Sequence, residues 1–218
     1  MRIHLKIEST NCTIPFDHQP LLVGTIHKWL GINNEHGEVS LYSFSRIEGG
    51  KATPDGLKFN RDAVFFISSH DVELIKKLVW GIQQDKTMFC GLTVKELELE
   101  QNPDLSNREH FLVGSPIFIK RRVEDKTEHI LYTDERAPEF LKETLQTKMK
   151  LAGIADDEFD ICFDTSYPRA KNNKINYKGI ENKANWCPVI IKGSPETKLF
   201  AWNVGLGNST GIGFGAIK

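Results

Sequence analysis

Hydrophobic periodicity along the first half of the chain restricts the folds that it can adopt. Four segments alternate apolar with polar residues or are rich in β-branched and aromatic residues, and they predict strands at Met1–Ile7, Val39–Ile47, Ala63–Ser68 and Thr93–Leu99. Two other segments repeat apolar residues at helical spacing and predict helices at Asp17–Leu30 and Asp71–Ile82. The resulting order of strand, helix, strand, strand, helix, strand is the ferredoxin-like arrangement, which the RNA recognition motif also uses.

The second half repeats this pattern with additions. The polar stretch Gln101–Arg108 contains Pro103 and predicts a linker. A strong helical pattern follows at Ala137–Leu151, and strands are predicted at Phe118–Arg122, Glu158–Phe163, Pro188–Lys192 and Leu199–Val204. We therefore predict an α+β fold of two tandem ferredoxin-like domains with antiparallel sheets, at residues 1–100 and 109–218.

Composition excludes several classes of protein. With 39% hydrophobic residues among 218, the chain can bury a core and is not disordered. No apolar run approaches the roughly 20 residues that span a bilayer, and the N-terminus has no secretory h-region, so we expect a cytoplasmic protein without membrane association. None of the four cysteines lies in a CxxC pair, which favours reduced thiols in the core over a metal site.

Positive charge is local, because the net charge of the whole chain is −1. The segment YPRAKNNKINYK, at Tyr167–Lys178, has no acidic residue and is predicted to be an exposed hairpin. A second basic run is Lys120-Arg121-Arg122. Runs of this size also occur on ordinary solvated surfaces, so binding of nucleic acid and plain solvation both remain open for them.

The chain ends in a glycine-rich segment, GLGNSTGIGFGAIK. Glycine permits positive φ and close approach of another backbone, and successive exposed amides can cradle phosphate oxygens. The segment is neither a Walker loop, since no GK[ST] follows, nor a dinucleotide fingerprint, since no helix can follow it. A flexible end is the alternative, but Ile212, Phe214 and Ile217 alternate with small residues and predict an ordered closing strand.

This segment resembles the signature loop of the RNA-processing Cas proteins, above all the sixth Cas family, which cuts CRISPR repeats. Residues near the N-terminus agree: the run from Ile14 to Leu30, with His18, Gln19 and His27, resembles the first helix of that family, and Leu41–Ser45 resembles its next strand. The resemblance implies two ferredoxin-like domains side by side, RNA on a positive face, and cleavage without metal or cofactor. In that reaction the ribose 2′-hydroxyl attacks and leaves a 2′,3′-cyclic phosphate and a 5′-hydroxyl.

The resemblance also suggests catalytic residues. It leads to His36, before Leu41, and to His27 within the first helix, as a general base and acid. Histidine suits both roles, because its unperturbed pKa of roughly 6.5 is close to working pH. A lysine often follows the catalytic histidine in the family, but residues 37–40 contain none. Lys51 is our choice for the cation that stabilises the transition state, with Lys28 and Arg46 as alternatives.

Each of these residues also has a structural interpretation: His27 could be a half-buried packing residue, His36 a solvated loop residue, and Tyr42 either a core residue or a stacking platform. For RNA binding we select cations and tail residues, namely Lys28, Arg46, Arg121, Arg169, Lys171, Lys174, Gly205, Gly207, Asn208, Ser209, Gly211 and Gly213. Expected partners are CRISPR repeat RNA, other Cas effector-complex subunits and a second copy of the chain. Two other functions remain open: a non-cleaving RNA-binding subunit, and a small-molecule enzyme on the same fold.

Overall fold

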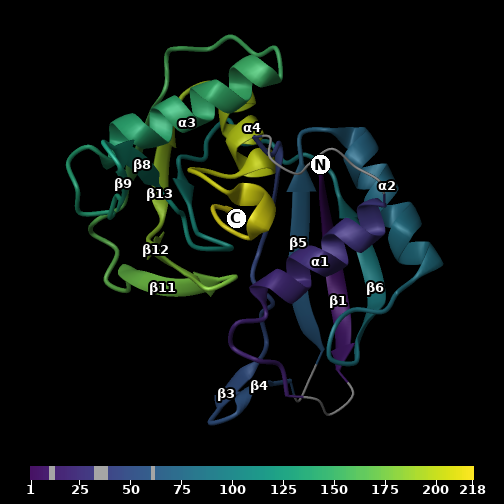
Figure 1. Cartoon of the computed structure of the whole chain (residues 1–218). Coiled ribbons are helices and arrows are strands. Elements are labelled where there is room, and N and C mark those ends of the chain that lie inside the picture. Colours follow the sequence, from purple (N-terminus) through teal and green to yellow (C-terminus); the bar gives the residue numbers. More distant parts are fainter. Residues whose placement is uncertain (10–12, 32–38, 60–61) are drawn as a thin grey trace.

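The N-terminal half of the chain is a four-stranded antiparallel sheet with two helices on one face. The structure is a computed structural model that describes residues 1–9, 13–31, 39–59 and 62–218 (Figure 1). The sheet has the order β2-β5-β1-β6. This half consists of β1 (Arg2–Ser9), α1 (Gln19–Leu30), β2 (Tyr42–Phe44), β5 (Ala63–Ser69), α2 (Val72–Gln84) and β6 (Leu92–Glu100). The predicted order of elements is confirmed, and a short hairpin of β3 (Lys51–Thr53) and β4 (Gly56–Lys58) is added to it.

Burial follows the sequence pattern in this half. Ile3, Leu5 and Ile7 of β1 are buried in one core with the apolar stripes of α1 and α2. The two helices cross closely at Gly81, where a Cβ atom would lie 2.0 Å from the carbonyl oxygen of Trp29. Glycine is therefore required at this crossing. No helix in the described ranges is long and apolar enough to cross a membrane.

The C-terminal half repeats the same strand order. Its main elements are β7 (His110–Phe111), α3 (Ala137–Leu151), β10 (Asp160–Phe163), β13 (Val189–Lys192) and α4 (Pro195–Val204), with the sheet order β10-β13-β7. The end of the chain pairs beside β7, because the amides of Leu112 and Lys218 donate to each other's carbonyl oxygens at 2.8 and 2.7 Å. It thus takes the place beside the first strand that β6 takes beside β1. Two hairpins decorate this half, β8 (Lys120–Val123) with β9 (Lys126–His129), and β11 (Lys171–Tyr177) with β12 (Ile180–Trp186).

Several predictions for this half were wrong. Residues 199–204 form the end of helix α4, not a strand, because Ser194 caps the helix by accepting from the amide of Thr197 (3.1 Å) and Gly205 ends it with φ +72°. These caps outweigh the strand preference of LFAWNV. The predicted strand at 118–122 begins at Lys120 and pairs only within its hairpin. The predicted closing strand is mostly a loop containing one 3₁₀ turn, η1 (Thr210–Ile212), and only its last residues pair.

The predicted strand at 39–47 is limited to β2, and the thiols are not all in the core, since Cys187 is buried whereas Cys90 is exposed. These two corrections do not alter the architecture.

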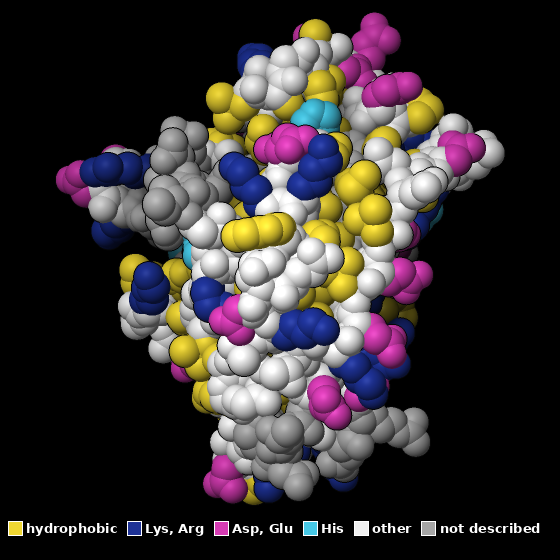
Figure 2. All heavy atoms as spheres, turned by 90° about the vertical axis from the view of Figure 1, so that its right-hand side faces the viewer, with side chains coloured by type: hydrophobic (Ala, Val, Ile, Leu, Met, Phe, Trp, Pro, Cys, Tyr) yellow, Lys and Arg dark blue, Asp and Glu magenta, His cyan; other side chains and the backbone are white. Residues whose placement is uncertain are grey.

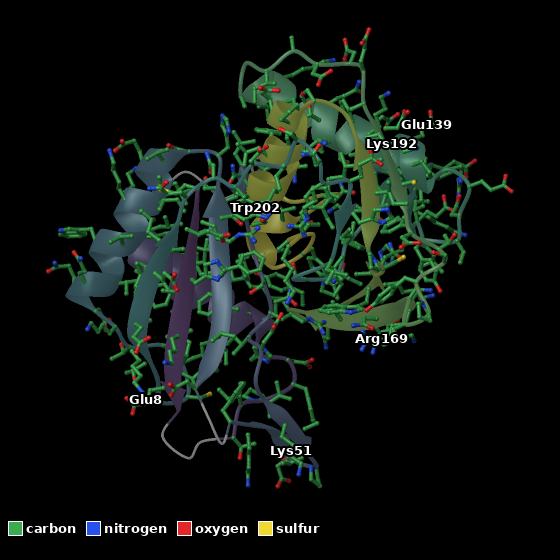
Figure 3. All side chains as sticks on the ribbon, turned by 180° about the vertical axis from the view of Figure 1, so that it is seen from behind. Glu8, Lys51, Glu139, Arg169, Lys192 and Trp202 are labelled. Carbon is green, nitrogen blue, oxygen red and sulfur yellow. The ribbon has the colours of Figure 1, made fainter. Side chains whose placement is uncertain are left out.

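The two halves meet around Arg2, which is only 2% exposed. Its guanidinium carbon lies 3.8 Å from the ring centre of Phe66 and 3.4 Å from that of Trp202. Nη2 donates to the carbonyl oxygens of Trp202 (3.1 Å) and Ile217 (2.7 Å). Figure 3 shows Trp202 between the two halves. A cation of the first strand therefore joins both halves to the C-terminal tail.

Candidate functional site

The glycine-rich tail is wedged between the halves and packs on β2. A Cβ atom at Gly211 would lie 2.2 Å from Ser40 Oγ, and one at Gly205 would lie 2.8 Å from the Cβ atom of Ser43. The Tyr42 hydroxyl donates to the carbonyl oxygen of Gly211 at 3.0 Å, and the Gln19 side chain donates to that of Ile212. The loop is thus ordered, and it contacts Ser40, the second residue after segment 32–38. Tyr42 is buried here, as the core interpretation predicted.

Lys148 of α3 fixes the position of this loop through hydrogen bonds. Its side chain is 3% exposed, and Nζ donates to the carbonyl oxygens of Val204 (3.3 Å) and Gly205 (3.1 Å) and to Thr210 Oγ1 (3.2 Å). Burial lowers the pKa of Lys148 to about 7, because the charged form loses its hydration. Thr210 Oγ1 in turn donates to the carbonyl oxygen of Ser40 (3.4 Å). Sequence reasoning missed this lysine, although it continues the helical stripe of Leu141 and Leu145.

A hollow of about 430 Å³, which we call the loop hollow, opens beside the tail. Its wall brings together four of the residues predicted to bind RNA, namely Arg121, Gly207, Asn208 and Ser209. Asn208 Oδ1 accepts from the amide of Lys120 at 2.9 Å, which fixes the loop against β8. Val39 and Ser40, the first two described residues after segment 32–38, also line this hollow.

A second cavity of about 340 Å³, the junction cavity, lies where both halves and the tail meet. It brings together three more predicted residues, Arg46, Lys174 and Gly213. Arg46 follows β2, and its guanidinium carbon is 5.5 Å from the ring centre of Trp186. Burial lowers the pKa of Arg46. Lys174 projects from β11 and forms an ion pair with Glu181 at 3.2 Å.

The basic segment was predicted to be a hairpin, but it forms only one strand of one: β11, which pairs with β12 after it. Arg169 and Lys171 share a third hollow with Tyr167 and Trp186. We refer to Arg169, Lys171 and Lys174 together as the hairpin cations.

More cations lie beyond this hairpin. The pKa of His129 is lowered by burial and then by the nearby charges of Lys183 and Lys120. Positive groups thus extend from the junction cavity past the hairpin to the loop hollow.

The face over α2 has a different character. Figure 2 shows acidic and basic side chains interspersed on it. Ion pairs form there, such as Lys76 with Glu73 at 2.7 Å. Positive charge is therefore balanced by acidic side chains on this face. On the hairpin side, Lys174 and Arg121 also have acidic partners, Glu181 and Glu143, which a bound polyanion would have to displace.

Comparison with known proteins identifies the family. Residues 99–218 match the family described as "CRISPR associated protein Cas6, C-terminal". The chain belongs to the Cas6 family. Over 241 residues it is 26% identical to the Pyrococcus furiosus protein named "Putative CRISPR-associated endoribonuclease-like protein Cas6", covering 100% of this chain and 98% of that protein.

Solved structures share the fold of this chain. One described as "Characterization of a Cas6-related gene from Pyrococcus furiosus" has a TM-score of 0.86 at 24% identity, covering 100% of this chain and 97% of the other. One described as "An RAMP protein binding different RNA substrates" has a TM-score of 0.85 at 21% identity, covering 100% and 98%. These likenesses confirm the paired ferredoxin-like fold.

Other residues suggested by the resemblance to Cas6 lie apart from both cavities or cannot be placed. His36 is outside the described residues. His27 is half-buried on α1, and Lys51 is exposed on the β3–β4 hairpin at one end of the molecule (Figure 3). Lys28 Nζ donates to Asp85 Oδ2 (2.8 Å) and to the carbonyl oxygen of Thr87 (2.6 Å). Neither the loop hollow nor the junction cavity is lined by these three described residues.

Proposed function

We propose that this Cas6 chain binds CRISPR repeat RNA and cuts it in the precursor transcript to release guide RNAs. One observation supports the proposal: the glycine-rich loop packs on Ser40, and Val39 and Ser40, which follow the segment containing His36 in the chain, line the loop hollow. The loop hollow, which Lys120 and Arg121 also line, is therefore close in the chain to the segment suggested to be catalytic.

The binding half of the proposal depends on charge and on the loop backbone. The hairpin cations, Arg46 and Arg121 can neutralise phosphates along one strand of RNA. The amides of Ser209 and Thr210 donate no hydrogen bond to any described residue, and both residues line the loop hollow. Such amides can donate hydrogen bonds to phosphate oxygens. Lys28 would have to leave Asp85 before it could contribute.

The proposed cleavage is an internal transesterification, in which the phosphorus changes its oxygen partner. The 2′-oxygen bonds to phosphorus while the bond from phosphorus to the 5′-oxygen breaks, which leaves a 2′,3′-cyclic phosphate and a 5′-hydroxyl. We assign His36 and His27 to take the 2′-hydroxyl proton and to protonate the leaving 5′-oxygen. Each such group typically contributes on the order of 10²–10⁴-fold. Lys51 remains our choice for the stabilising cation, as the sequence suggested.

The second candidate is a subunit that binds CRISPR RNA without cutting it. The positions of the suggested cations favour this function, since Lys28 is engaged by Asp85 and Lys51 lies on the β3–β4 hairpin. The chain would then assemble into an effector complex with a second copy of itself or with another Cas subunit. The fold serves both functions equally well.

Incubation with repeat RNA in EDTA separates the two candidates. We expect a single cut, a cyclic phosphate end, and no cut in RNA that carries a 2′-deoxy sugar at that position. Tight binding with the RNA left intact would establish the second candidate instead. Cleavage only after addition of a divalent metal would refute the metal-independent chemistry.

A further inference from the structure

The junction cavity has the size and the lining of a small-ligand site. Its volume of about 340 Å³ falls within the range of roughly 300–1,000 Å³ that such sites have. Leu22, Phe44 and Ile175 contribute apolar surface. The polar groups include one acid, Asp17, together with His18, Gln19, Arg46 and Lys174. These residues come from both halves of the chain, so a bound group would contact both.

Phe16 forms part of this wall and remains 56% exposed. A large aromatic side chain that lines a cavity and is not buried offers a free face to a planar group. Unstacked RNA bases are held in this way on aromatic rings. The residue therefore points to a base as the planar part of the ligand.

Arg46 supplies the complementary charge. Among the described residues, its guanidinium has no hydrogen-bond or ion-pair partner, although most of its surface is covered. A cation in such a place is costly unless an anion joins it. Lys174 adds a second positive group to the same cavity. A phosphate is the anion that accompanies a base in RNA.

We propose, building on the function proposed above, that the junction cavity binds one unstacked nucleotide of the RNA, with its base on Phe16 and its phosphate on Arg46. Because both halves line the cavity, this nucleotide fixes the position of the strand relative to the loop hollow. The nucleotide must be unpaired, since a base inside a helix cannot enter.

The test uses repeat RNA with a 2′-deoxy sugar at the cut position, so that cleavage does not interfere with binding. A series of RNAs is made, each with one abasic position, and the Kd of each is measured by fluorescence anisotropy. For the unsubstituted chain, one position should weaken binding by roughly 5- to 150-fold, the value of about 1–3 kcal/mol for one stacked base. With Phe16→Ala, the penalty at that position should fall to about twofold or less, since little stacking remains to be lost.

Two further variants sharpen the result. Trp80→Ala, at a residue that is 65% exposed on α2, is the matched control and should retain the full abasic profile. A neutral methylphosphonate in place of the phosphate next to the sensitive base should weaken binding by the unsubstituted chain. In Arg46→Gln, the same replacement should no longer weaken binding. Thermal melting of each variant shows that it is folded.

The outcomes distinguish this inference from the function on which it rests. Tight RNA binding with no sensitive position, or with the same profile in Phe16→Ala, would overturn the nucleotide site and leave the proposed function standing. Absence of binding to repeat RNA would refute the proposed function itself, and the nucleotide site with it.

Discussion

Replacing Lys148 with methionine should remove a pH-dependent part of the stability of this protein. The ammonium group donates to neutral oxygen atoms of Val204, Gly205 and Thr210 and has no acidic partner among the described residues. Burial removes its hydration and lowers its pKa from 10.5 to about 7. Between pH 7 and 10, the unfolded chain keeps a proton that the folded chain has released. The free energy of unfolding therefore rises with pH in this window, by up to about 1.4 kcal/mol per unit.

The size of the effect follows from the same pKa values. From pH 7 to pH 9, the free energy of unfolding of the unsubstituted chain should rise by about 2 kcal/mol relative to Lys148→Met. Below pH 7, both states hold the proton and the difference becomes constant. Urea unfolding at pH 6, 7, 8 and 9 measures this difference at each value.

The control lies on the same helix. Lys150 is exposed, so Lys150→Met should follow the unsubstituted chain across the pH range. A difference between the unsubstituted chain and Lys148→Met that stays constant from pH 7 to 9 would refute the reasoning, because it would mean that the lysine is not desolvated.

Stability and binding give three other tests. Arg2→Ala should lower the free energy of unfolding by about 3 kcal/mol, through lost packing and unpaired carbonyls, while Lys6→Ala on the same strand should change it by less than about 0.5 kcal/mol. Equal urea midpoints would contradict the interdomain role of Arg2. Gly215→Ala should lower Tm far more than Gly153→Ala. The two glycines have nearly the same φ, +74° at Gly215 and +72° at Gly153, but of the two only Gly215 has a backbone oxygen, that of Leu206, 2.0 Å from where a Cβ atom would lie. Equal losses of Tm would show that the loop yields. Alanine at the hairpin cations should flatten the dependence of log K on log salt by about 2, whereas alanine at three exposed lysines on the α2 side should not; an unchanged slope would remove the hairpin from the RNA path. Those control lysines are Lys76, Lys77 and Lys86.

The order of elements could be predicted because periodicity reports directly which side of an element is buried. Helix α3 begins and ends where its pattern does, at Ala137 and Leu151. Helix α4 was missed because its aromatic and β-branched residues favour a strand, although Ser194 and Pro195 carry the start signal of a helix. Local preference failed where capping decided the outcome.

The candidate site could be predicted from the sequence only in part. The sequence located the glycine-rich loop, but its partners Ser40, Tyr42 and Lys148 are remote in the chain, and no local pattern pairs them. The sequence predicted that Lys28 binds a phosphate, whereas folding places Asp85 beside it. Contacts between distant segments depend on tertiary packing, which one sequence does not display.

The proposed cleavage is tested most directly by single-turnover cutting of repeat RNA in EDTA, with and without His36→Ala. The account predicts that this change slows cleavage by about 10²-fold or more while the Kd for intact RNA stays within a few-fold. His110→Ala, at a histidine whose side chain is 69% exposed, should cut like the unsubstituted chain. A loss of less than about tenfold in His36→Ala would contradict the assignment of His36 as a main catalyst, and RNA left intact by the unsubstituted chain would contradict cleavage itself.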